Sequence, residues 1–102
     1  MKVSNAFEVF AQEAPEHQAA WMEVVQQLDK ASALDKKTEE LAYLAVMAVM
    51  RLESGLPFHV KMAKANGATR DEIISSILVG LPAAGNVVVS SLPIALAAFD
   101  DE

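Results

Sequence analysis

Histidine is the residue type in this chain best suited to acid/base chemistry near neutral pH, because imidazole has an unperturbed pKa of about 6.5. His59 follows a glycine-containing turn and stands beside Pro57 and Phe58. We expect it just inside a helix, either as an acid/base group or as a partly buried residue hydrogen-bonded to a backbone carbonyl. His17 lies in a polar segment and is expected on the solvated surface.

Charged residues near His59 in the sequence could support such chemistry. Glu40 lies near the start of a long apolar stretch, where a carboxylate is often solvated or interacts favourably with the helix dipole. Arg51, Lys61 and Lys64 could steer an anion, although the i, i+3 spacing of the two lysines also fits a solvated stripe. Both interpretations of these residues stay open at this point.

The residues that several other kinds of catalysis or cofactor binding require are absent from this sequence. The chain has no cysteine, so it has neither a thiol of its own nor a disulfide. Two histidines without HxxxH or HxxE spacing argue against a zinc site, and the glycines form neither a dinucleotide-binding nor a phosphate-binding loop. The serines lack the context of a nucleophile elbow. We therefore predict no metal and no cofactor.

The composition predicts one domain over residues 1–102, with apolar surface that another protein chain covers. Of the 102 residues, 53% are hydrophobic and only 22% are charged. A chain of this size buries roughly 60–70% of the surface that it exposes when unfolded. The remaining apolar side chains must therefore be buried in contact with another molecule. We expect a homo-oligomer. The net charge of −6 would repel a phosphate backbone, which argues against nucleic-acid binding.

The N-terminus lacks the apolar region of a signal peptide, and the absence of cysteine fits a reducing compartment, so we expect a cytoplasmic protein. The uncharged stretch from Ile73 to Phe99 is long enough to cross a bilayer. Because breaking residues interrupt it, we expect two helices packed in a protein interior and no membrane span. These breaks are Gly80, Pro82, Gly85, Asn86 and Pro93.

The remaining sequence predicts an all-α fold of about six helices. Asn5 with Glu8 is a possible capping box for the first helix, and Pro15 can open the second. Asp35 is a plausible N-cap for a long third helix that reaches about residue 53. We expect its apolar interior, residues 41–50, to be buried at the centre of the fold.

Residues that typically start or end helices mark the boundaries of the later helices. Pro57 can open a fourth helix, which Gly67 can end in a left-handed cap. Thr69 with Glu72 forms a capping box before a fifth helix that runs toward residue 80. A sixth helix is expected from about residue 84 to 99, with Pro93 kinking or restarting it.

Taken together, these segments resemble the carboxymuconolactone decarboxylase family, which includes the alkylhydroperoxidase D-like proteins. The resemblance rests on Leu34–Leu41, His59 and the Gly67–Ile73 segment, with Ala84-Gly85-Asn86 beyond them. It covers about two-thirds of the chain, residues 32–99. It implies an alkylhydroperoxidase D-like all-helical fold whose subunits form trimers or hexamers.

The resemblance also implies roles for individual residues. In the peroxidase branch, a glutamate and a histidine form a proton relay with a Cys-x-x-Cys pair. The relay positions fall on Glu40 and His59, whereas the cysteine positions hold Leu52 and Gly55. Because peroxide reduction needs a thiolate and a resolving thiol, we do not expect thiol peroxidase activity.

The decarboxylase branch also lacks the cysteine pair and keeps the histidine. This similarity favours an enzyme that transfers protons on a small, anionic organic molecule. His59 would be the general acid/base and Glu40 its orienting partner, with Lys61, Lys64 or Arg51 as anion clamps. The alternative is a non-catalytic oligomer that binds a small molecule or only builds an assembly. A peroxidase with an external thiol partner ranks last.

Overall fold

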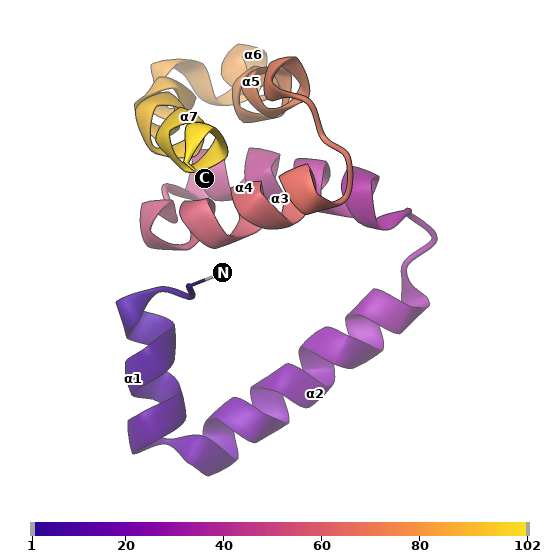
Figure 1. Ribbon diagram of the computed structural model, residues 1–102, viewed down its shortest axis with the longest axis vertical. Coiled ribbons are helices and arrows are strands. Elements are labelled where there is room, and N and C mark those ends of the chain that lie inside the picture. Colours follow the sequence, from indigo (N-terminus) through magenta and orange to yellow (C-terminus); the bar gives the residue numbers. More distant parts are fainter. Residues whose placement is uncertain (1, 102) are drawn as a thin grey trace.

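The computed structural model describes residues 2–101, which form helices joined by short connections and contain no β-strand. The predicted all-α class is confirmed. The described residues form seven α-helices and two 3-10 helices, and Figure 1 shows how the α-helices are arranged. In chain order they are α1 (Asn5–Glu13), α2 (Pro15–Ala31), α3 (Lys36–Met50), η1 (Glu53–Gly55), α4 (Leu56–Ala65), α5 (Arg70–Leu78), α6 (Leu81–Ala84), η2 (Gly85–Ser91) and α7 (Leu92–Asp100).

Local capping fixes the boundaries of the helices that carry the candidate site. Asp35 Oδ1 accepts the backbone N–H of Thr38 at 2.8 Å and starts α3. Gly67 has φ +96° after α4, where the next amide, Ala68 N–H, donates to the Ala63 carbonyl at 2.9 Å. Thr69 then forms the predicted capping box with Glu72 and starts α5.

Three boundaries differ from the sequence-based expectation. The first helix is capped by Ser4, whose Oγ accepts Phe7 N–H at 3.2 Å, so the expected capping box at Asn5 is wrong by one residue. Helix α3 ends at Met50 because Arg51 takes a left-handed conformation with φ +57°. The segment around Val88 is a 3-10 helix instead of part of an α-helix from residue 84, whereas the expected restart is confirmed, because Pro93 lies in the first turn of α7.

The core lies among α3, α4, α5, α7 and η2, which form the upper part of the molecule in Figure 1, here named the body. Its largest fully buried apolar side chains are Leu44, Leu56, Ile73, Ile77, Val60 and Val88. Helix α3 buries only one face, through residues such as Leu44 and Met47. The expectation that residues 41–50 are buried all round is wrong for the single chain, because Tyr43, Val46 and Met50 are exposed.

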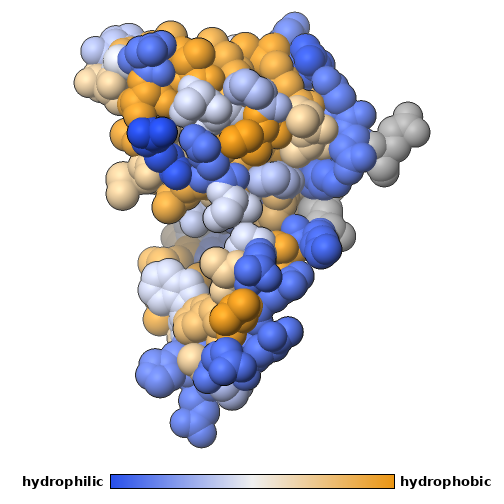
Figure 2. All heavy atoms as spheres, turned by 90° about the vertical axis from the view of Figure 1, so that its left-hand side faces the viewer, coloured by the Kyte–Doolittle hydropathy of each residue, from blue (hydrophilic) through white to orange (hydrophobic). Residues whose placement is uncertain are grey.

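Helices α1 and α2 pack against each other and stand apart from the body, and we name them the arm (Figure 1). Neither helix contains a buried residue. The space-filling view in Figure 2 shows the molecule narrowing between the body and the arm. The arm therefore receives little stabilisation from the core of its own chain.

Residues 70–100 taken as one stretch are long and apolar enough to cross a membrane. In the fold they are divided among α5, α6, η2 and α7, and the longest of these helices has nine residues. Nine residues of α-helix span only about 14 Å, less than half of the roughly 30 Å of a bilayer core. The expectation that breaking residues divide this stretch is confirmed.

Candidate active site

The candidate site is formed where α3 crosses α4. Glu40 lies in the second turn of α3, and His59 lies in the first turns of α4. Glu40 Oε2 is 2.9 Å from His59 Nδ1, although nineteen residues separate the two in the chain. The two residues that the resemblance paired are therefore in hydrogen-bond contact.

The Glu40 carboxylate is the more buried partner. Glu40 is 6% exposed, whereas the His59 side chain keeps 26% of its surface exposed. A buried carboxylate is costly unless cations or hydrogen-bond donors compensate its charge. Here both oxygens have such a neighbour, because Oε1 lies 3.6 Å from Lys36 Nζ while Oε2 faces the imidazole.

Lys36 is a part of this site that the sequence analysis missed, since a lysine in a first helical turn usually points to solvent. Its ammonium group lies 3.5 Å from Asp29 and 3.6 Å from both Glu39 and Glu40. Partial burial acts to lower the pKa of Lys36, but the attraction of these carboxylates outweighs it and raises the pKa above its ordinary value. The i, i+4 spacing from Lys36 to Glu40 was the available signal.

Two aromatic rings hold the imidazole edge-on. The Tyr43 ring centroid lies 4.6 Å from that of His59 with an interplanar angle of 72°, and Phe58 lies at 5.2 Å and 82°. Both geometries are the T-shaped arrangement that aromatic pairs prefer. Tyr43, three residues after Glu40 on α3, was also missed by the sequence analysis. These contacts restrict the rotation of His59 and leave its Glu40-facing nitrogen in place.

This geometry defines the roles of the two imidazole nitrogens. When Glu40 is ionised, its carboxylate can only accept, and Nδ1 is then the nitrogen that carries the proton and donates it to Glu40. Within residues 2–101, Nε2 has no hydrogen-bond partner. A histidine arranged in this way can take up a proton at Nε2 while the carboxylate compensates the new positive charge. The pair has the geometry that general acid/base chemistry requires.

The three predicted anion clamps have other surroundings. Lys61 Nζ lies 2.5 Å from Asp101 Oδ2, and Lys64 donates to the Phe99 carbonyl at 2.6 Å and lies over the Phe99 ring. Both lysines therefore hold the C-terminal end of α7 against α4. Arg51 is exposed in its left-handed position at the end of α3. A role for any of the three in anion binding stays a prediction.

The model of the carboxymuconolactone decarboxylase family matches residues 15–97, more than half of the chain. The chain belongs to the carboxymuconolactone decarboxylase family. A carboxymuconolactone decarboxylase family protein from Legionella pneumophila, solved in its apo form, has a similar structure with a TM-score of 0.79 and 27% sequence identity. The similarity covers 93% of this chain and 85% of the Legionella chain. No curated protein matches the sequence significantly.

This carboxymuconolactone decarboxylase family member has no cysteine, and the structure shows what occupies the two expected thiol positions. Leu52 is half exposed at the start of η1, and Gly55 ends that turn. A Cβ atom on Gly55 would lie 2.8 Å from Met47 Cε, so the methionine side chain takes up the space of a side chain there. The described part of the chain also contains no cluster of three metal-binding side chains.

Proposed function

We propose that this carboxymuconolactone decarboxylase family protein is a proton-transfer enzyme, decarboxylase-like, acting on a small anionic organic molecule. The observation that carries the proposal is the contact between the buried Glu40 carboxylate and His59 Nδ1, which leaves Nε2 available. His59 is the general acid/base. Glu40 fixes its tautomer and compensates the charge of the protonated ring.

In a decarboxylation of this kind, the bond between the substrate carbon and its carboxylate breaks. Carbon dioxide leaves, and the electron pair of that bond stays on the substrate as an enolate. Protonated His59 then delivers its Nε2 proton to the enolate carbon and becomes neutral. A proton from solvent restores the imidazolium for the next turnover, so no oxidant, reductant or other co-reactant is needed.

Lys36 supports this cycle by compensating the charge of the Glu40 carboxylate. Its ammonium group, 3.6 Å from Oε1, attracts the carboxylate without competing for Oε2, the oxygen that binds His59. Lys36 therefore acts through Glu40 as a positioning residue. The carboxylate of a substrate would require further cations, for which Arg51, Lys61 and Lys64 remain the candidates. Use of the two lysines would require breaking their contacts with α7.

Turnover of carboxymuconolactone, the compound in the family's name, tests the proposal. We expect the wild-type protein to release carbon dioxide and, in deuterated water, to place one deuteron on a carbon of the product. His59→Asn should abolish both without changing the assembly. Glu39→Gln, one residue from Glu40 on the same helix, is the matched control for Glu40→Gln. Equal turnover by His59→Asn and wild type would contradict the proposal.

A second candidate is a non-catalytic protein that binds small molecules. Two open hollows of about 370 and 510 Å³ lie along the arm, and Val24 lines both. They favour this candidate because they lie away from the Glu40–His59 pair, where a molecule could bind without reacting. This candidate predicts that His59→Asn changes stability or assembly instead of a reaction rate. Thermal unfolding and light scattering of that variant distinguish the two functions.

A further inference from the structure

The arm carries an apolar stripe that nothing in its own chain covers. Trp21, Val24, Val25 and Leu28 lie at i, i+3, i+4 and i+7 on α2, on one side of the helix. Each is between 38% and 65% exposed. We call these four residues the arm stripe. An amphipathic helix normally buries such a face, because each large apolar side chain contributes about 1.5–3 kcal/mol when fully buried.

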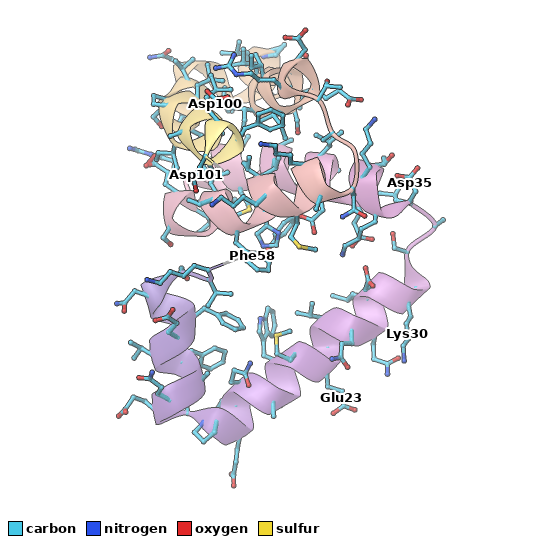
Figure 3. The ribbon with its side chains drawn as sticks, in the orientation of Figure 1. Glu23, Lys30, Asp35, Phe58, Asp100 and Asp101 are labelled. Atoms are coloured by element: carbon cyan, nitrogen blue, oxygen red, sulfur yellow. The ribbon has the colours of Figure 1, made fainter. Side chains whose placement is uncertain are left out.

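The arm stripe faces the side on which the body lies. Glu23 and Lys30 occupy the opposite side of α2, and Figure 3 shows both pointing away from the body. In the same view, Phe58 points from α4 toward the arm. Phe58 is one of the two rings against His59. The uncovered face of α2 and the candidate site therefore lie on the sides of the arm and the body that face each other.

A second uncovered stripe lies on α3 beside the site. Tyr43, Val46 and Met50 are at i, i+3 and i+7 and are 46%, 55% and 63% exposed. We call them the body stripe. Its first member is the ring that contacts His59. The arm stripe and the body stripe thus both extend over two helical turns, from i to i+7, and both are largely exposed in the single chain.

The accessible surface of the chain exceeds that of a compact monomer by about the area that one partner buries in an interface. Its accessible surface is 6519 Å². A compact monomer of 10.9 kDa is expected to expose about 5600 Å². The difference, roughly 900 Å², is close to the ~800 Å² that each partner buries in a standard interface. The radius of gyration of 14.0 Å likewise exceeds the ~12.8 Å of a compact chain of this length.

Charge favours a second copy as this partner. The arm is acidic, with five carboxylates against two lysines in residues 2–31. Arg51, next to Met50 of the body stripe, has no ionic partner in the part of the chain that the structure describes. An acidic helix with an apolar face therefore complements an apolar stripe that ends in an arginine. Both surfaces are present in every copy, so exchange between copies covers both.

We propose that the arm stripe of one copy packs on the body stripe of a second copy, so that the arm of one subunit covers the Glu40–His59 pair of its neighbour. The site is then formed between two subunits, and the partner's arm limits the access of water to the imidazole without closing it off. This interface follows from the uncovered surfaces and holds whether or not the pair is catalytic.

The absence of cysteine makes the interface directly testable by cross-linking. Val24→Cys and Val46→Cys are placed in separate copies with different tags, and the two are co-expressed. A short bismaleimide should then link one copy to the other. Val79→Cys, a control site that is 65% exposed on the body, replaces Val46→Cys in the matched experiment and should give little product. Equal linking through the two body sites would overturn the proposal.

A charge on the stripe provides a second, independent measurement. Val24→Glu should reduce the molar mass measured by light scattering, while circular dichroism shows that the helices remain. Gln26→Glu adds the same charge away from the stripe and should keep the wild-type mass. A monomeric wild-type protein, or a Val24→Glu variant with unchanged mass, would overturn the proposal. Neither result depends on turnover, so failure here is distinguishable from failure of the proposed function.

Discussion

His59 Nδ1 lies 2.9 Å from Oε2 of Glu40, and the carboxylate is almost entirely buried while the imidazole remains partly open. Their different exposure separates the functions of the two groups. The carboxylate is held by α3 and cannot leave the pair without exposing or protonating itself. The ring can exchange protons at Nε2 while Nδ1 stays bound. This asymmetry is what a general acid/base needs.

Glu40→Gln should release the His59 ring from a single tautomer, because an amide accepts the Nδ1 proton less strongly than a carboxylate does. We expect the ring nitrogen chemical shifts of His59, measured by NMR, to report one tautomer in wild type and a mixture of two in the variant. Since the chain has only two histidines, His17 serves as an internal reference. Glu39→Gln should keep the tautomer of wild type. Equal tautomer populations in wild type and Glu40→Gln would argue against a specific pair.

Lys36→Met should destabilise the protein by about 1 kcal/mol, because the buried Glu40 carboxylate loses a compensating positive charge. Lys37→Met is the matched control, because Lys37 pairs with Glu72 at 2.9 Å instead of with Glu40. That pair is more exposed, so the control should lose less stability. Urea unfolding of both variants measures the difference, and equal losses would remove Lys36 from the site.

Acid should destabilise the body, because three of its carboxylates accept hydrogen bonds that favour their ionised form. The backbone N–H of Thr38 lowers the pKa of Asp35, the Lys37 ammonium lowers that of Glu72, and the Arg70 guanidinium lowers that of Asp100. Because each pKa is lower in the folded state, the stability they contribute is present above their unfolded values of about 4 and is lost as pH falls through the folded values.

Glu72→Gln isolates one of these contributions. The variant should be less stable than wild type at pH 7, and the difference should shrink below about pH 4, where wild-type Glu72 also loses its charge. Urea unfolding followed by circular dichroism at several pH values measures this convergence. A difference that stays constant down to pH 3 would show that Glu72 acts through packing and not through its charge.

Gly55→Ala should destabilise the protein by less than about 1 kcal/mol, because the new methyl group meets only the flexible end of the Met47 side chain. The methyl carbon would lie 2.8 Å from Met47 Cε, and Met47 is only 3% exposed. In a Met47→Val background, which removes that terminal carbon, the same substitution should cost less. A double-mutant cycle of unfolding free energies tests this coupling. Independent effects of the two substitutions would contradict the contact.

The two elements that carry the site were predictable from local chemistry. Asp35 and Thr69 cap helices because their side chains accept amides two or three residues ahead, and such interactions need no tertiary contact. Pro57 and Gly67 delimit α4 for the same local reason. The resemblance added the pairing of Glu40 with His59. The position of Lys36 could not be read in this way, because a lysine in a first turn can reach solvent or a carboxylate equally well.

The sequence by itself determined the helical class, the helix boundaries to within a few residues and the absence of a thiol, since each follows from residue type and short-range spacing. Only the tertiary structure decided that Glu40 is buried against His59, that Lys61 and Lys64 hold α7, and that the arm leaves its apolar stripe uncovered. These properties depend on how helices far apart in the chain pack, and periodicity fixes which face of a helix is apolar without fixing what that face meets.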